Sequence, residues 1–248
     1  WQAIREKLAA VCDSERVHVL VVECYQGVYH EEIIEGLKAL APALWIDTRS
    51  LFKSVPEIEA MTYPYVTDDR LFGFRSNFTY DDFFDPDKRV SACERIRMTE
   101  GLVVVYGHGA ATLCPDADKI VYVDMARWEI QLRSRRHEID GLGVENRVEG
   151  ASFHYKRGYF VDWLVCDRLK KRLLPKADYW LDTHRAGEPK MITGETLRQG
   201  LTKTARQPFR VVPFFDPAPW GGQWMKAVCG LDPEPANYGW CFDCVPEE

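Results

Sequence analysis

The stretch Val17-His-Val-Leu-Val-Val-Glu-Cys-Tyr-Gln-Gly-Val-Tyr-His-Glu-Glu-Ile-Ile34 decides the fold. It opens on an apolar run rich in valine, which is typical of a buried strand. A short turn that contains Gly27 follows, and residues 30–40 then repeat apolar side chains at helical spacing. The sequence therefore predicts a strand (17–22), a tight loop and a helix (30–40), which is the unit from which parallel sheets are built.

Further apolar runs bounded by polar or glycine residues predict strands at 43–47, 102–106, 119–124 and 177–182. Helical patterns lie between them, at 1–12, 81–100, 126–138 and 157–173. Residues 50–80 and the glycine-rich stretch 141–150 lack a regular pattern, and we expect them to be irregular. Buried strands separated by helices predict a three-layer α/β domain, with a parallel sheet covered on both faces.

The composition changes after Pro208, where Pro213-Phe-Phe-Asp-Pro-Ala-Pro-Trp-Gly-Gly222 resembles a linker or an entry segment. We therefore expect one domain over residues 1–207, followed by a short segment (208–248) that belongs to another domain. The chain opens without methionine and stops without an evident closing element. From this we expect it to be a piece of a longer protein.

Charge and composition exclude several classes of function. The 248 residues carry a formal charge of −6, which gives no electrostatic attraction for nucleic acid or for an anionic membrane surface. No apolar run approaches the ~20 residues that cross a bilayer, and residues 1–12 form an amphipathic helix rather than a signal peptide. Most of the eight cysteines lie in apolar segments, which predicts reduced thiols and a cytoplasmic protein.

Metal binding has little support in the sequence. Cys241 and Cys244 form a CxxC pair, and Cys229 offers a third possible zinc ligand, but no second CxxC exists. We favour buried core thiols over a zinc site there. The histidines show neither HxH nor HExxH spacing, so we predict no metal site among these residues.

The loop after the first strand has the layout of a phosphate-binding loop, GxxxxGK[ST], but lacks most of its chemistry. Cys24 and Tyr29 stand where that pattern has its two glycines. His30 replaces the lysine that meets the phosphate charge, and Glu31 replaces the hydroxyl residue that holds Mg²⁺. Only Gly27, inside the loop, remains. These replacements argue against ordinary phosphoryl transfer.

Five segments together resemble the uridine-kinase-like branch of P-loop kinases. They are the strand–loop–helix at 17–34, and the segments 45–52, 103–107, 123–136 and 155–163. The resemblance implies a P-loop NTPase type of fold over about residues 15–185. It places Asp47 where the family has an acid that meets the substrate hydroxyl, a catalytic role only if the chain is an active kinase that uses Mg-ATP. It also places Tyr106 where the family has a metal-orienting glutamate.

Two further features are candidates for binding phosphate. Gly107-His108-Gly109 follows a buried strand and forms either a nest of backbone N–H groups or a simple tight turn. Arg127, Arg133 and Arg136 share a helical stretch that resembles a kinase lid, and they either bind phosphate or form a solvated face. The predicted phosphate or ligand site thus comprises Gly27, His30, Gly107, His108, Gly109, Arg127, Arg133 and Arg136.

The tail resembles a different family. Pro219-Trp-Gly-Gly-Gln-Trp-Met225 and Trp240-Cys-Phe-Asp-Cys-Val-Pro-Glu-Glu248 resemble the opening of a phosphomannose-isomerase-like cupin domain. The resemblance implies a parent protein of the mannose-6-phosphate isomerase type. A zinc site of that family would lie mostly beyond residue 248.

Three functions remain open. The first is a catalytically degenerate kinase-like module that binds a phosphorylated sugar or nucleotide, or serves as a regulatory docking partner of the downstream isomerase-like domain. The second is an active ATP-dependent kinase for a small nucleoside or sugar, with an atypical phosphate loop. The third is a structural scaffold that holds a homo-oligomer together.

Overall fold

The computed structural model describes residues 1–69, 71–207, 209–214, 222–232 and 241–246. The chain divides into two compact units, Trp1–Leu197 and Arg198–Glu248, and the boundary falls within helix α10 (Gly194–Thr204). The pocket discussed below lies in the first unit. The second unit contains the antiparallel strands β7 (Phe209–Phe214) and β8 (Cys241–Pro246), and helix α11 (Gly222–Cys229).

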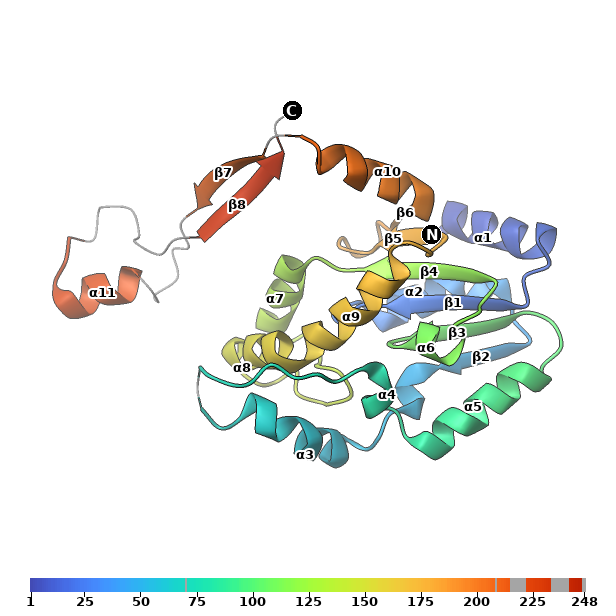
Figure 1. The fold of residues 1–248 in the computed structure, drawn as a ribbon, viewed down its shortest axis with the longest axis horizontal. Helices are drawn as coiled ribbons and strands as arrows, with labels where there is room; N and C mark the ends of the chain where they lie inside the picture. The colour runs from blue at the N-terminus through green and yellow to red at the C-terminus, as the bar shows by residue number, and fades with distance from the viewer. Residues whose placement is uncertain (70, 208, 215–221, 233–240, 247–248) are drawn as a thin grey trace. The chain divides into compact units, whose positions relative to one another are not determined.

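The first unit contains a six-stranded sheet with the strand order β2-β3-β1-β4-β5-β6 (Figure 1). Its strands are β1 (Val19–Cys24), β2 (Leu44–Asp47), β3 (Val103–Gly107), β4 (Lys119–Asp124), β5 (Tyr179–Asp182) and β6 (Lys190–Thr193). The first five are parallel, and β6 pairs antiparallel with β5. The α/β class and the mostly parallel sheet are confirmed. Strand β6 was not predicted, because its short sequence Lys-Met-Ile-Thr is mostly exposed and lacks the apolar run of the inner strands.

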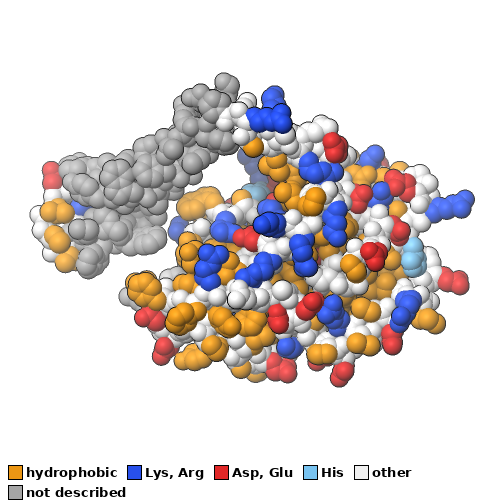
Figure 2. All heavy atoms as spheres, in the orientation of Figure 1, with side chains coloured by type: hydrophobic (Ala, Val, Ile, Leu, Met, Phe, Trp, Pro, Cys, Tyr) orange, Lys and Arg blue, Asp and Glu red, His pale blue; other side chains and the backbone are white. Residues whose placement is uncertain are grey.

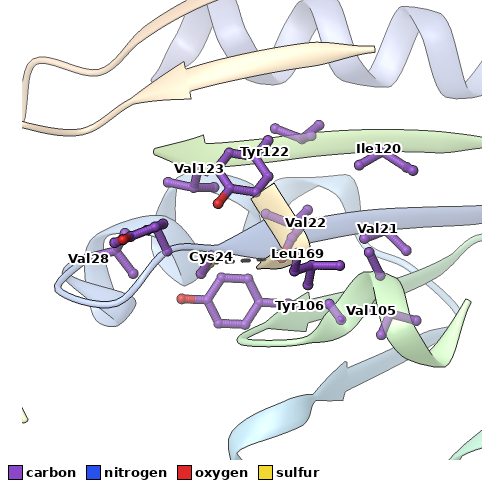
Figure 3. Packing of buried hydrophobic residues seen from close by; sticks show 14 of the residues in the cluster. Val21, Val22, Cys24, Val28, Val105, Tyr106, Ile120, Tyr122, Val123 and Leu169 are labelled. Atoms are coloured by element: carbon purple, nitrogen blue, oxygen red, sulfur yellow. Dashed lines mark hydrogen bonds between the residues drawn. The ribbon is translucent and has the colours of Figure 1, made fainter. Parts of the chain in front are cut away.

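Strands β1, β3 and β4 form the centre of the core. Val21, Val105 and Val121 are fully buried, as are most of their neighbours on these strands. Figure 3 shows Val21 and Val105 close to Leu169 of helix α9 (Trp163–Leu173) in this core. Because strands in the middle of a parallel sheet are covered on both faces, continuous apolar runs are the sequence pattern that such strands require.

The remaining helices of the first unit are α1 (Gln2–Ser14), α2 (His30–Leu37), α3 (Val55–Val66), α4 (Tyr80–Phe83), α5 (Pro86–Met98), α6 (Ala110–Leu113), α7 (Arg127–Arg135) and α8 (Ala151–Arg157). Short 3₁₀ turns cover Lys38–Leu40 and Thr48–Leu51, and one π-helical turn covers Gly158–Asp162. Helices lie on both faces of the sheet, with α9 on the near side and α2 on the far side in Figure 1.

Three sequence predictions about helices are wrong. Residues 50–80 were expected to be irregular, but they contain α3, which Ser54 and Glu57 begin with a reciprocal capping box. The expected helix at 81–100 is two helices, because Pro86 starts a new one after the Asp85 cap. The expected helix at 157–173 begins earlier, at Ala151, and includes the π-helical turn.

Exposed aromatic residues gather on part of the surface. Tyr63, Phe72, Phe74 and Tyr155 are each more than two-fifths exposed, and Figure 2 shows hydrophobic side chains over α3 and α8. Adjacent exposed apolar side chains are typical of surfaces that contact other molecules. The predicted association with a downstream domain or with copies of the chain stays a prediction. Among the described residues, no helix is both long and apolar enough to cross a membrane.

Arg133 of α7 fixes the loop that follows β1. Its side chain is fully buried, and its guanidinium donates to the carbonyl oxygens of Gly27, Thr183 and His184 at 2.8–3.0 Å. It also pairs with Glu129 at 3.1 Å and lies 3.6 Å from the ring centre of Tyr29. A buried guanidinium is costly unless its donors are satisfied, and here backbone carbonyls satisfy them.

We expect Arg133→Met to destabilise the protein by about 3–5 kcal/mol, because it leaves three carbonyl oxygens of the loops without their donor. Arg135→Ala, two residues away on the exposed side of the same helix, should change stability by less than about 0.5 kcal/mol. Urea unfolding of both variants measures the difference. Equal effects at the two positions would contradict this role of Arg133.

Candidate functional site

The connections after β1 and β3 leave the sheet in opposite directions. The first leads through α2 to β2, and the second leads through α6 to β4 on the other side of β1. Since crossovers between parallel strands are right-handed, these two connections lie on opposite faces of the sheet. They leave a crevice between the carboxyl ends of β1 and β3, which is where open α/β sheets bind ligands.

A pocket of about 660 Å³ opens at this crevice. Its walls come from the loop after β1, the turn after β2 and the segment 138–147. It carries three cations, Arg49, Lys53 and Arg147. The carboxylates in its lining are Glu31, Glu138, Asp140 and Glu145. The remaining lining residues are Gly27, Val28, Tyr29, His30, Phe52, Val55, His108, Ile139, Gly141, Gly143 and Val144.

His30 and His108 meet in this pocket. Their Nε2 atoms are 3.1 Å apart, and the Nδ1 atom of His30 lies 2.6 Å from the hydroxyl oxygen of Tyr106. The Nδ1 atom of His108 lies 2.9 Å from the carbonyl oxygen of Cys24. Figure 3 shows the Tyr106 ring beside Cys24 in the core. The sequence predicted both histidines as site residues, but it did not predict that they touch.

When both rings are neutral, the hydrogen bonds that link Tyr106, His30, His108 and Cys24 can run in one direction only. A carbonyl oxygen only accepts, so Nδ1 of His108 carries the proton shared with Cys24, and its Nε2 accepts. His30 must then donate from Nε2 to His108, and its Nδ1 accepts from the Tyr106 hydroxyl. Each ring nitrogen is thereby satisfied.

Neither histidine supplies a positive charge. Burial, the neighbouring His108 and the charge of Arg49 lower the pKa of His30 well below its usual value. Burial above all, together with Arg49, lowers the pKa of His108 to about 4. The position that holds a lysine in a phosphate-binding loop is therefore occupied here by an uncharged ring.

The backbone N–H groups after β3 are occupied by the protein itself. The two carboxylate oxygens of Glu23, on β1, accept from the N–H groups of Gly109 and Ala111 at 2.7 and 2.8 Å. The carboxyl group of Glu23 thus takes the N–H groups of Gly109 and Ala111, and a role of residues 107–109 in binding a ligand stays a prediction. Gly107 has a φ of 117°, and a Cβ atom there would lie 2.5 Å from the hydroxyl oxygen of Thr48. The sequence gives no signal for the role of Glu23, because one acid inside an apolar strand forms no pattern.

Gly27 shapes the loop rather than offering it to a ligand. Its φ is 98°, and an added Cβ atom would lie 2.8 Å from Ile130. Its carbonyl oxygen accepts from Arg133. Both constraints hold the loop against α7, so that Tyr29 and His30 face the pocket.

The N-terminus of α2 opens into the pocket. Tyr29 precedes the helix without a side-chain cap, and Tyr29, His30 and Glu31 all line the pocket. The first N–H groups of a helix have no partner within it and favour an anion. Glu32 bonds Trp1 and Gly187, away from the pocket lining, so Glu31 is the carboxylate of this turn that lines the pocket.

The predicted phosphate-binding arginines do not line the pocket. Arg133 is buried against backbone carbonyls, as described above. Arg127 pairs with Asp167 at 2.7 Å, and Arg136 pairs with Glu129 at 3.1 Å and with Glu138 at 2.9 Å. Their role in phosphate binding stays a prediction, and in this arrangement their charges are directed to protein groups.

Asp47 and Arg49 form an ion pair at the end of β2. Arg49 approaches Asp47 through Nε and Nη2, at 3.1 and 2.7 Å. Asp47 also accepts from the Arg49 N–H group and so begins the 3₁₀ turn. The sequence analysis named Asp47 but missed Arg49, as well as Lys53 and Arg147. Single cations in loops have no periodic signal, and only the fold brings them to one pocket.

The described residues contain no group of three or more histidine, cysteine, aspartate or glutamate side chains arranged to hold a metal ion. The predicted alternative at Cys241 and Cys244 falls where the structure describes no side chains. The cysteines that are described are free thiols, and Cys12, Cys24 and Cys166 are buried.

Burial raises the pKa of Glu23 to about 8, although two backbone amides favour its charged form. Between its ordinary pKa of 4.5 and about 8, the folded protein holds a proton that the unfolded chain releases. We therefore expect the wild-type free energy of unfolding to fall by a few kcal/mol, relative to Glu23→Gln, as the pH rises from 5 to 8. Urea unfolding of both proteins at the two pH values tests this. Parallel pH profiles would contradict a protonated Glu23.

Comparison with known proteins places the chain in a family. No curated protein matches it. A family model described as "Domain of unknown function (DUF8485)" matches residues 1–206. The matched segment contains the whole six-stranded sheet and every residue that lines the pocket. The chain therefore belongs to the DUF8485 family.

Proposed function

We propose that the chain binds a phosphorylated small molecule in the pocket at the ends of β1 and β3, and does not transfer its phosphoryl group. The observation that carries the proposal is the uncapped N-terminus of α2, which opens into a pocket that also presents Arg49 and Lys53. Helix N-termini beside cations favour phosphate. A volume of about 660 Å³ suits a ligand of sugar-phosphate or nucleotide size.

Arg49 is the cation best placed to grip the ligand. Its Nε and Nη2 groups donate to Asp47, and among the described residues these bonds leave Nη1 for another acceptor. Its side chain is 36% exposed, so a ligand can reach it. Lys53 donates to the carbonyl oxygen of Asp82 and adds a second positive charge at the same wall.

The same residues argue against transfer of a phosphoryl group. Transfer needs permanent positive charge at the migrating group, and His30 is neutral. Glu31 puts a carboxylate where a phosphate-binding loop has its metal-holding hydroxyl. The Asp47 carboxylate, the expected base of an active kinase, is engaged by Arg49. These three residues therefore support ligand binding without phosphoryl transfer.

Within this proposal, the chain is a degenerate kinase-like module with a P-loop NTPase type of fold. The strand–loop–helix at the start of the sheet and the position of the pocket at the end of β1 support that assignment. We further propose that it serves an isomerase-like parent protein, by sensing a phosphorylated sugar or by docking. The residues that resemble that family (219–225 and 240–248) lie partly outside the described residues, and their side chains lie entirely outside.

We expect a phosphorylated ligand to raise the melting temperature of the protein and to give a measurable Kd by titration calorimetry. ATP, UTP and mannose 6-phosphate are the probes, and mannose is the unphosphorylated control. Arg49→Ala should weaken binding about ten- to hundredfold, because a hydrogen bond to a charged group contributes about 1.5–3 kcal/mol.

Arg89→Ala is the matched control. Arg89 also pairs with one aspartate, Asp81, and its side chain is 34% exposed, but it lies outside the pocket lining. Equal affinities of the two variants would refute the assigned role of Arg49. If none of the phosphorylated probes binds, only the docking role remains. Mg²⁺-dependent ATP turnover that Asp47→Asn abolishes would replace the proposal with an active kinase.

A further inference from the structure

We propose that His30 and His108 form a two-histidine site for a divalent transition-metal ion, with Zn²⁺ as the ion that fits best. Both side chains line the pocket, and they come from the two loops that flank the crevice, after β1 and after β3. This inference does not depend on the proposed phosphorylated ligand, because the metal alone is the probe.

The spacing of the two rings suits a shared ion. A tetrahedral zinc ion with Zn–N bonds of about 2.0–2.1 Å holds two ligand nitrogens about 3.3 Å apart. The Nε2 atoms of His30 and His108 are 3.1 Å apart, so a shift of a few tenths of an ångström suffices. The ring centroids are 4.9 Å apart and the rings are nearly perpendicular, so the rings meet at an angle rather than end to end.

Both rings already make the outer contacts that metal-bound histidines require. A ligating histidine almost always donates its second ring N–H to a carbonyl, a carboxylate or a similar acceptor, which fixes the ring. Nδ1 of His108 donates to the carbonyl oxygen of Cys24. Nδ1 of His30 lies 2.6 Å from the Tyr106 hydroxyl, which lies 3.4 Å from the carbonyl oxygen of His30.

Metal binding needs only a change of tautomer at His30. In the metal-free pair, His30 donates from Nε2 to His108 and accepts at Nδ1 from Tyr106. With Zn²⁺ bound, the proton resides on Nδ1 and is donated to the Tyr106 oxygen, while the Tyr106 hydroxyl turns to the carbonyl of His30. Both Nε2 lone pairs then face the ion. No proton is gained or lost, and no buried polar group loses its partner.

The chemistry of the ligands selects the metal. Imidazole nitrogen suits Zn²⁺, Cu²⁺, Ni²⁺ and Fe²⁺, whereas Mg²⁺ requires oxygen ligands. Two protein ligands leave positions open for water, and the carboxylate of Glu31 lines the same pocket. Arg49, Lys53 and Arg147 are the pocket cations that oppose a metal ion, and the ion pairs of Arg49 with Asp47 and of Arg147 with Asp140 offset two of these charges. The two imidazoles thus offer nitrogen ligands, which suit a transition metal better than Mg²⁺.

Zinc titration of the full chain tests the site, followed by calorimetry and by metal analysis after dialysis. All proteins carry Cys229→Ser, Cys241→Ser and Cys244→Ser, so that the tail thiols contribute nothing. We expect one Zn²⁺ per chain, no competition by millimolar Mg²⁺, and at least tenfold weaker binding in both His30→Gln and His108→Gln. His18→Gln, at the opposite end of β1 and exposed, is the matched control and should bind like the parent.

The zinc affinity of Tyr106→Phe distinguishes binding at the His30–His108 pair from nonspecific binding at the surface. The substitution leaves both ligands in place and removes the hydroxyl partner of His30, so we expect a tenfold to hundredfold loss of zinc affinity. Circular dichroism checks that each variant is folded, and the imidazole ¹⁵N shifts of the parent protein report Nε2 coordination directly. Failure of the parent protein to bind zinc would overturn the proposal. So would zinc affinities in the folded His30→Gln variant equal to those of the parent, or ¹⁵N shifts of His30 and His108 that zinc leaves unchanged.

Discussion

The internal carboxyl group of Glu23 governs the carboxyl end of the central strands, because it fills a site of backbone N–H groups within the protein itself. Glu23 lies on the central strand β1, and its side chain accepts hydrogen bonds from the backbone N–H groups of Gly109 and Ala111. These amides would otherwise be open to a ligand, because consecutive N–H groups after a strand form a natural anion site. With the Glu23 carboxyl group in place, the N–H groups of Gly109 and Ala111 are occupied, and the proposed ligand site consists of the N-terminus of α2 and the cations beside it.

On the other side of the crevice, a buried arginine also bonds to the protein backbone instead of facing the pocket. Arg133 does not reach toward the pocket but binds the carbonyl oxygen of Gly27 from behind, and it stacks on Tyr29. The loop after β1 is therefore held against α7, and its His30 lies beside His108 of the loop after β3 in the pocket. The proposed function, binding without phosphoryl transfer, rests on this arrangement. The nitrogen atoms of the two histidines favour a transition metal over magnesium.

The sequence predicted the strands of the sheet well, because β1, β3 and β4 are buried on both faces and need continuous apolar runs. It failed where local caps outweigh periodicity. Helix α3 was missed, since Pro64 and the exposed Tyr63 hide its pattern, while the Ser54 and Glu57 capping box starts it. Strand β6 was missed because an exposed edge strand of four residues has no apolar signature.

The candidate site was predictable only in part. His30, His108 and Gly27 were named from the loop pattern, and the structure brings them to one pocket. The contact of His30 with His108 joins residues that are 78 positions apart; it depends on the pairing of β1 with β3, and no spacing rule predicts it. The arginines at 127, 133 and 136 were predicted as phosphate ligands because they share a helical stretch. Their spacing does not show which group each guanidinium binds, and in the structure they bind protein groups. Arg49 could be recognised as a site residue only from the fold, which places the end of β2 beside His108.

The most direct measurement is a crystal structure of the protein soaked with ATP and magnesium. The account predicts a phosphate group between the first turn of α2 and Arg49, with Glu23 still bonded to the N–H groups of Gly109 and Ala111. A triphosphate wrapped by residues 24–30, with its terminal phosphate and magnesium in line for transfer beside His30, would contradict the account.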